Sequence, residues 1–548
     1  MASYLNPGSG RFKKALDSGI YVDKTQMIRY LNSVVNTEQR YVCVSRPRRF
    51  GKSMAANMIC AYYDREADSK GMFENTGLHT KASPDDEWDR YLGSFDVIRL
   101  VMTDFVGKDK DINSFTHRLS CSIMQELKDK YPEVKNDPDD LALSMDRYYK
   151  QSGISFVVVI DEWDAIFREY KNDREAQTKY LDFLRDWLKD KEYIALAYMT
   201  GILPIKKYGK HSALNMFYDY SMISPMQMAE YTGFTADEVK ELCSRYSMDY
   251  DEIRDWYDGY SLRKPVPVEK REDYRMGRYD NKVSVYSPLS VVNAMHTGII
   301  ENYWNKTETY EALAEYIRMD FDGLREVVAV LMDGGRCKVD IGTYQNDMSS
   351  FAYRDDILTM LIHLGYLCYD PDTSEVYIPN KEVQDEFKAS TKDREWQEVF
   401  REYRLSQELL EATWAGDENK VAEMLERAHN KAANKTYNDE AALSYAIQYA
   451  YYSAEKYYTV IPELDSGKGY ADIAYIPAPG YQDKPAMLIE LKYNKNVDGA
   501  IAQIHRQQYP ERLEHYKGKL LLVGINYDGD RANIDQEFKH HSCRIEKA

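Results

Sequence analysis

The sequence predicts an α/β protein of several domains, and three observations support this fold class. The first third alternates short apolar, β-branched runs with helical stretches, and the last 110 residues read helix, three strands, helix, strand. The composition, with 44% apolar and 13% aromatic residues in 548, can fill several hydrophobic cores. At roughly 150 residues per domain, a chain of this length suggests three or four domains.

The strands expected in the first third are separated by helices, which is typical of a parallel sheet covered on both faces. Between the strands, apolar residues recur at steps of three and four, as in helices Ile112–Tyr131 and Arg174–Asp190. The expected strands are Tyr41–Ser45, Phe95–Phe105, Phe156–Asp161, Tyr193–Thr200 and Met216–Ile223.

The middle of the chain reads as mainly helical from Tyr231 to Asn305, with an exposed, charged loop over Arg263–Lys282. An amphipathic helix, Tyr353–Leu367, then ends at Gly365 and precedes two short strands around a DPDTS turn, which is winged-helix-like. A polar stretch from Lys388 marks a domain boundary. The expected divisions are a lead-in (1–40), the α/β domain (41–230), the helical and winged-helix-like region (231–387) and a C-terminal domain (388–548).

The C-terminal domain is expected to have the order α-β-β-β-α-β. Its helices are Asp439–Lys456 and Val497–Tyr516. Its strands are Tyr457–Pro462, Tyr470–Ile476, Ala486–Tyr493 and Lys519–Ile525.

The charge opposes a general attraction to nucleic acid, since the chain carries −18 at neutral pH. The acidity is uneven, however. From Lys484 onward there are 11 Lys and Arg against 9 Asp and Glu, so the preceding residues carry −20. Any contact with nucleic acid at the C-terminal end must therefore be local.

Two further features indicate a cytoplasmic protein. No apolar run approaches the ~18 residues that cross a membrane, and the first residues lack the apolar core of a secretory signal. The seven cysteines are scattered and form no CxxC pair, which suits buried thiols in a reducing compartment. We expect no membrane partner and no zinc or disulfide framework.

A phosphate-binding loop is predicted between the strand Tyr41–Ser45 and the following helix. The second half of the pattern G-x-x-x-x-G-K-[ST] is intact at Gly51-Lys52-Ser53, but Arg46 replaces its first glycine. In such a loop, backbone N–H groups cradle the phosphates, the lysine reaches the terminal phosphates and the serine binds Mg²⁺. The remaining loop residues are Pro47, Arg48, Arg49 and Phe50, and the arginines would add positive charge beside the anion. The alternatives are an ordinary basic strand-to-helix turn, or a loop that binds nucleotide but hydrolyses it slowly.

The complementary acidic residues lie at the end of the strand FVVVID. Asp161 is the expected carboxylate for Mg²⁺, and Glu162 beside it can polarise the attacking water as a general base. The simpler alternative is that these two acids only cap the N-terminus of the next helix. Thr200 ends the next strand and could contact the γ-phosphate or water, although a threonine before glycine is more often a turn residue.

A second constellation in the C-terminal domain suggests metal-dependent nuclease chemistry. Asp472 lies within one strand, and Glu490-Leu491-Lys492 follows on the next. Alternate strand residues share a face, so Glu490 and Lys492 point together. Two carboxylates and the Leu491 carbonyl can hold Mg²⁺, and Lys492 can orient the nucleophile or neutralise charge. A surface Glu490–Lys492 salt bridge is the simpler alternative.

These motifs carry a resemblance that covers nearly the whole chain. The segments FKKALDSGIYVDKTQMIRYLN, RPRRFGKS, FVVVIDEWD, GFTADEVKEL, WYDGY and VYSPLSVVN resemble the bacterial AAA-ATPase-like family. The segment GYADIAY…IELKY resembles the PD-(D/E)XK nuclease superfamily, in which members of that family commonly end. The resemblance implies a P-loop NTPase domain that binds ATP, with RPRRFGKS as its usual loop. Tyr21–Thr25 would lie where it could pack on the nucleotide base.

The favoured interpretation is an ATPase that regulates a Mg²⁺-dependent nuclease acting on nucleic acid. Two alternatives are a nucleotide-dependent interaction switch whose nuclease-like domain only binds, and an ATPase whose nuclease needs a missing partner. The intact set of Asp472, Glu490 and Lys492 favours the first over the switch. The sequence leaves a homo-oligomer open and does not distinguish DNA from RNA.

Overall fold

The computed structural model describes residues 4–82, 87–106, 111–137, 140–205, 213–304, 310–319, 323–344, 351–392, 394–431, 440–465, 470–478, 481–507, 516, 518–529 and 540–548. The chain divides into two compact units. The first contains residues 1–316 and 338–387, and the second contains residues 317–337 and 388–548. Residues 317–337, assigned from the sequence to the middle region, thus lie in the second unit.

A parallel five-stranded sheet forms the centre of the first unit. Its strand order is β2-β3-β4-β1-β5, and every neighbouring pair is parallel. The strands are β1 (Tyr41–Ser45), β2 (Asp96–Val101), β3 (Phe156–Asp161), β4 (Ile194–Gly201) and β5 (Tyr218–Tyr220). The predicted α/β class is confirmed. The strand expected over Phe95–Phe105 is shorter, because a 3₁₀ turn (Met102–Asp104) follows Val101.

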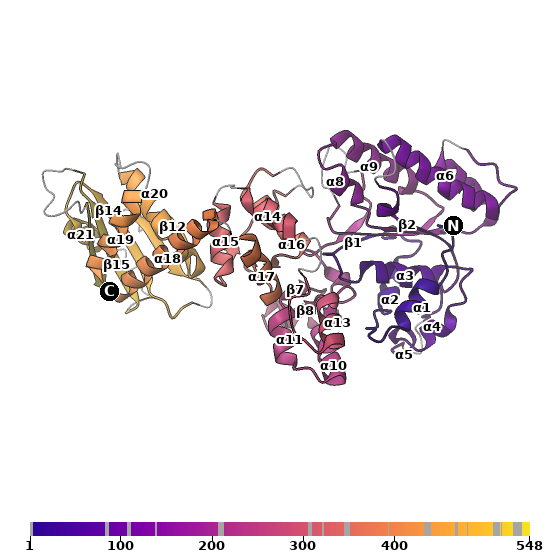
Figure 1. Ribbon diagram of the computed structural model, residues 1–548, viewed down its shortest axis with the longest axis horizontal. Helices are drawn as coiled ribbons and strands as arrows, with labels where there is room; N and C mark the ends of the chain where they lie inside the picture. Colours follow the sequence, from indigo (N-terminus) through magenta and orange to yellow (C-terminus); the bar gives the residue numbers. More distant parts are fainter. Residues whose placement is uncertain are drawn as a thin grey trace. The chain divides into compact units, whose positions relative to one another are not determined.

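Helices cover both faces of this sheet, as Figure 1 shows. One face packs against α6 (Ile112–Lys130), α7 (Leu141–Ser152), α8 (Ala165–Glu169) and α9 (Arg174–Leu188). The other packs against α2 (Met27–Val34) and α3 (Lys52–Tyr63). Successive strand residues such as Cys43 and Val44 therefore enter opposite cores, which explains the unbroken apolar runs.

The middle region is mainly helical, as predicted, and it also contains a small sheet. It holds an antiparallel sheet in the order β6-β8-β7, beside α10 (Ala236–Tyr246), α11 (Tyr250–Tyr257) and α13 (Pro288–Thr297). These strands, β6 (Phe234–Thr235), β7 (Tyr260–Arg263) and β8 (Lys282–Tyr286), have two to five residues, too few to show periodicity. Most of the expected loop over Arg263–Lys282 is exposed and includes α12 (Arg271–Arg275).

The predicted helix and hairpin are present. The helix α16 (Arg354–Leu364) ends at Gly365, which adopts the left-handed conformation with φ of 87°. The antiparallel pair β10 (Cys368–Asp370) and β11 (Glu375–Tyr377) follows, and α17 (Lys381–Ser390) comes next.

The second unit is built on a mixed sheet in the order β12-β13-β14-β15-β16, in which only β14 and β15 pair in parallel. The strands are β12 (Tyr458–Asp465), β13 (Tyr470–Pro477), β14 (Ala486–Tyr493), β15 (Leu520–Tyr527) and β16 (His541–Lys547). One face packs against α18 (Arg394–Ala415), α19 (Glu418–Lys431) and α20 (Glu440–Ala450), and the other against α21 (Val497–Gln507). The predicted α-β-β-β-α-β order is confirmed, whereas α18, α19 and β16 were not foreseen.

The WYDGY segment has a structural role in the first unit. Tyr260 Oη donates to the Gly365 carbonyl at 2.6 Å, and Tyr257 Oη donates to the Glu301 carbonyl at 2.8 Å. Gly259 has a φ of 122°, and a Cβ there would lie 1.9 Å from the Pro379 carbonyl oxygen. Only glycine fits between β7 and the segment that precedes α17.

We expect Gly259→Ala to destabilise the first unit by roughly 3 kcal/mol, because it adds a backbone clash to a strained φ. Gly277→Ala is the matched control: φ there is 67°, but no atom lies within 4 Å of the added Cβ. The control should cost only about 1 kcal/mol. Denaturant unfolding of both variants gives the comparison, and equal losses would contradict this role of Gly259.

Candidate nucleotide and metal sites

The phosphate loop lies between the carboxyl end of β1 and the first turn of α3. Gly51 precedes the helix in the left-handed conformation, with φ of 83°, and Arg49 is also left-handed at 67°. The Lys52 ammonium folds back into the loop and donates to the carbonyls of Arg46 (2.9 Å) and Pro47 (2.7 Å). Lysine and glycine thus occupy the positions that the phosphate-loop pattern requires.

The Lys52 ammonium is held in a low-dielectric site. Burial lowers the pKa of Lys52 to about 8, against three nearby carboxylates whose charges raise it. The side chain is 8% exposed. A buried cation bonded only to carbonyl oxygens is ready to exchange them for phosphate oxygens.

Arg46 differs from its expected role. Its guanidinium is fully buried and donates to the carbonyls of Ser45 (2.8 Å), Tyr220 (2.7 Å) and Met228 (3.1 Å). Burial lowers the pKa of Arg46 to about 10, so the group stays charged at neutral pH. The side chain joins β1 to β5 and the chain beyond it, and does not add charge beside a bound anion. Arg46 is therefore part of the scaffold under the loop.

A cavity of about 720 Å³ opens at the phosphate loop, a size typical of a small-ligand site. Its polar side includes Arg48, Arg49, Gly51, Lys52, Ser53 and Glu162. Its apolar side includes Phe12, Ile20, Val22, Phe234, Leu289 and Val292. A phosphate cradle joined to an apolar pocket fits a nucleotide, and Ser53 is the residue of this loop that would hold Mg²⁺.

The Tyr21–Thr25 segment divides between the cavity and the fold. Tyr21, Val22 and Lys24 line the cavity. Lys24 is anchored there, because its ammonium donates to Glu238 at 2.6 and 2.7 Å. Asp23 and Thr25 instead accept hydrogen bonds from the first N–H groups of α5 (Gly77–Thr80), and so fix this short helix.

The acid at the end of β3 is tightly held. β4 lies between β1 and β3, so Thr200 at its end sits beside Asp161 and donates to it at 2.5 Å. The second Asp161 oxygen lies 3.6 Å from the buried Arg99 guanidinium. Thr200 is fully buried and, like the nearly buried Asp161, does not line the cavity; its hydroxyl orients the Asp161 carboxylate. Arg99, on β2, was missed because a single arginine in an apolar run carries no sequence signal.

Glu162 reaches the cavity from an unusual backbone position. Its φ is 55°, a left-handed conformation that a glutamate rarely adopts. Its carboxylate forms an ion pair with Arg168 at 2.8 Å, and Arg168 also contacts Asp164 at 3.1 Å. Asp164, which was noted in the sequence only as part of FVVVIDEWD, is fully buried. Strain of this kind is typical of functional sites.

The predicted residues of the second unit meet at the β13–β14 pair. Asp472 accepts a hydrogen bond from the Leu491 N–H at 2.7 Å. The Lys492 ammonium lies 2.9 Å from both the Glu490 carboxylate and the Leu491 carbonyl. Glu490 and Lys492 are nearly buried, at 1% and 7% exposure. This burial argues against the surface salt bridge considered from the sequence.

This arrangement fits a single divalent cation. The lysine ammonium rests on the carboxylate and carbonyl that would bind a metal, so these oxygens already favour positive charge. Among the described residues, no three His, Cys, Asp or Glu side chains gather as a metal-binding group. The sequence also suggests that Tyr509 lines this site and that Glu440 adds a third acid; Tyr509 and the Glu440 side chain lie outside the described residues.

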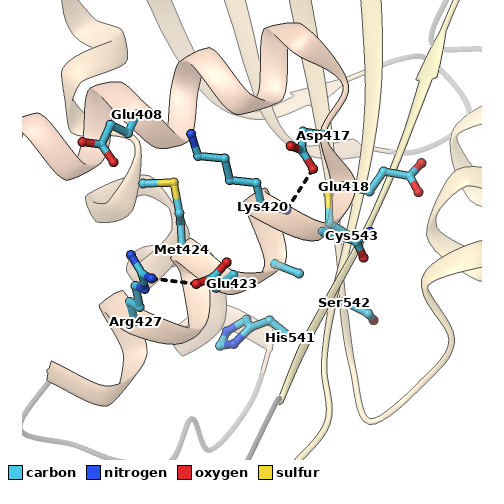
Figure 2. Close-up of a pocket in the computed structure, with 12 residues that line it drawn as sticks. Glu408, Asp417, Glu418, Lys420, Glu423, Met424, Arg427, His541, Ser542 and Cys543 are labelled. Atoms are coloured by element: carbon cyan, nitrogen blue, oxygen red, sulfur yellow. Dashed lines mark hydrogen bonds and ion pairs between the residues drawn. The ribbon is translucent and has the colours of Figure 1, made fainter.

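A separate groove of about 570 Å³ lies between α19 and β16 (Figure 2). It does not include Asp472, Glu490 or Lys492. Glu418 accepts the Ile545 N–H at 2.9 Å, and Glu426 accepts those of His540 and His541. These glutamates satisfy outward N–H groups of the edge strand β16, so we assign this region to edge protection.

Two known families match separate parts of the chain. Residues 8–210 match the family described as predicted AAA-ATPase, and residues 439–537 match the PD-(D/E)XK nuclease superfamily. The chain joins an AAA-ATPase-like domain to a PD-(D/E)XK nuclease-superfamily domain. The resemblance stated from the sequence is confirmed.

Individual relatives are distant. An uncharacterized protein from the vnfD 5′ region of Azotobacter chroococcum is 25% identical over 318 residues, which are 55% of this chain and 53% of the relative. The chain thus spans about half of that protein. Solved structures of Cdc6p from Pyrobaculum aerophilum and ORC2 from Aeropyrum pernix are 12% and 11% identical. The alignments cover 69% and 70% of this chain and 93% and 96% of those chains, with TM-scores of 0.23 and 0.30. Such low scores carry no argument.

Within the described part of the chain, no helix has both the length and the apolar character needed to cross a membrane.

We expect the affinity for ATP to fall as the pH rises above about 8, the pKa of buried Lys52. Below that pH the ammonium is charged and the affinity should be flat, whereas by pH 9 about tenfold should be lost. An ordinary lysine would titrate near 10.5. Calorimetric titration between pH 7 and 9.5 measures this. Lys52→Ala should bind ATP on the order of 10–100-fold more weakly at pH 7. A constant wild-type affinity up to pH 9.5 would contradict this assignment.

Proposed function

We propose that this protein is an ATPase whose first unit regulates a Mg²⁺-dependent nuclease in the second unit. Two sites support the proposal, and the second carries it: Asp472 and Lys492 both contact the Leu491 backbone, and Lys492 also contacts Glu490. A sheet retained only for binding has no need of two carboxylates and a buried lysine at one point.

In the ATPase reaction, Lys52 and the loop N–H groups bind the terminal phosphates, and the apolar side of the cavity encloses the base. Asp161, oriented by Thr200, and Ser53 would hold Mg²⁺, which when bound neutralises the phosphate charge. Glu162 accepts a proton from the attacking water. Because Glu162 lines the same cavity as Lys52, both groups can reach one phosphate chain.

In the nuclease reaction, Asp472, Glu490 and the Leu491 carbonyl would hold Mg²⁺, which when bound activates water and stabilises the charge of the phosphodiester transition state. Lys492, which contacts Glu490 and the Leu491 carbonyl, would neutralise charge on the scissile phosphate or orient the nucleophile. Local charge favours this end of the chain for nucleic acid, since residues from Lys484 onward are net positive.

The direct test is incubation of the purified protein with labelled DNA and RNA, with Mg²⁺ or Mn²⁺, and with and without ATP. Cleavage that requires the metal and changes with ATP supports both halves of the proposal. Binding without cleavage under every condition would favour an interaction switch.

We expect Glu162→Gln to retain ATP binding and to lose turnover by ~10²–10⁴, because the amide keeps the shape but cannot accept the proton. Phosphate release and ATP titration on the same preparation separate the two properties. Undiminished turnover would show that Glu162 is structural.

We expect Asp472→Asn and Glu490→Gln each to abolish metal-dependent cleavage, since each removes one ligand charge. Metal affinity should fall by at least the roughly 10–100-fold that loss of an outer-shell partner costs. Lys492→Ala should also stop cleavage but still bind Mn²⁺, because lysine is not a ligand. Cleavage assays and Mn²⁺ titration test all three variants, and thermal melting confirms their folding. Wild-type cleavage by Asp472→Asn would overturn the site.

A further inference from the structure

Arg168 joins two carboxylates beside the cavity at the phosphate loop. The proposed ATPase reaction, as described for Lys52, Asp161 and Glu162, gives this arginine no role. One guanidinium nitrogen lies 2.8 Å from Glu162, and the other lies 3.1 Å from Asp164. The side chain is 17% exposed, so this is not a loose surface pair. It comes from α8, the short helix that follows β3 and its acids.

The Asp164 end of this bridge is fixed. Asp164 is fully buried, and its second carboxylate oxygen accepts the backbone N–H groups of Ile202 (3.0 Å) and Leu203 (3.1 Å). These residues directly follow β4, whose end carries Thr200. Arg168 is therefore anchored to the part of the fold that also orients Asp161.

The Glu162 end needs such an anchor. Its side chain is 37% exposed and faces the cavity, and its backbone is left-handed. Among the described residues, Arg168 is the only side chain that bonds to this carboxylate. A flexible glutamate held at one oxygen keeps its position while the other oxygen stays available to water.

We propose that Arg168 is a positioning residue of the ATPase reaction, which holds the Glu162 carboxylate at the rim of the cavity. The inference rests on the proposed ATP hydrolysis with Glu162 as base. Arg168 does not itself line the cavity, so it acts through Glu162 and not on the phosphates. Only arginine suits this task, because its planar fork reaches both carboxylates at once.

The test compares Arg168→Lys with Arg168→Ala, each in the wild-type chain and in Glu162→Gln. Lysine keeps the charge beside Asp164, so that variant should fold even if removal of the arginine does not. Arg245→Lys is the matched control, since Arg245 forms an exposed i,i+4 pair with Glu241 on α10. Single-turnover hydrolysis, ATP affinity and melting temperature are measured for each protein.

In the wild-type chain, Arg168→Lys should lower kcat by roughly 10–10²-fold, because a misplaced base costs that much. The KM, ATP affinity and melting temperature should stay near wild type. In Glu162→Gln, the same substitution should cause no further loss, since the base is already absent. The control should keep full activity.

Three results would overturn the inference: full kcat in Arg168→Lys, an equal fall in both backgrounds, or a fall matched by lost ATP binding or melting temperature. The second would mean that Arg168 acts on something other than Glu162. The proposed function fails separately, if the wild-type protein does not hydrolyse ATP or if Glu162→Gln is fully active.

Discussion

Buried cations bonded to backbone carbonyls hold the centre of the first unit. Arg46 joins the end of β1 to β5 and to Met228, and Lys52 closes the phosphate loop on its own carbonyls. Carbonyl oxygens at the end of a buried strand need donors, and a cation supplies several at once. The loop is thereby shaped before any ligand arrives, with its lysine pointing inward.

The parallel sheet determines which charges can meet. The strands β1, β4 and β3 are parallel neighbours, so their carboxyl ends lie at the same edge of the sheet. The loop lysine, Thr200 and the acids of β3 therefore meet there. Three carboxylates there, those of Asp161, Glu162 and Asp164, face three cations, those of Lys52, Arg99 and Arg168. Burial of charges of one sign alone would cost free energy. Because negative and positive groups are present in equal number, the site can be both buried and charged.

In the second unit, too, buried carboxylates are paired with a buried cation, but fewer charged groups take part. Lys492 lies on Glu490 and the Leu491 carbonyl, while Asp472 is fixed by the Leu491 N–H. The backbone of one strand residue thus orients an acid on one side and a cation on the other. In each unit a buried lysine ammonium, that of Lys52 or Lys492, bonds to backbone carbonyl oxygens at the candidate site.

The sequence alone determined the α/β class, the phosphate loop, the acids after β3 and the Asp472–Glu490–Lys492 set. Each depends on local order along the chain: β3 and β14 have the predicted bounds because their apolar residues follow one another or, at the end of β14, alternate with charged residues. Only the tertiary structure decided that Arg46 is scaffold, that Thr200 holds Asp161, that Arg99 lies beside Asp161 and that Arg168 bridges Glu162 and Asp164. It also revealed the short β6, β7 and β8. A side chain's partner depends on segments far away in the chain, such as Met228 for Arg46, and periodicity carries no record of them.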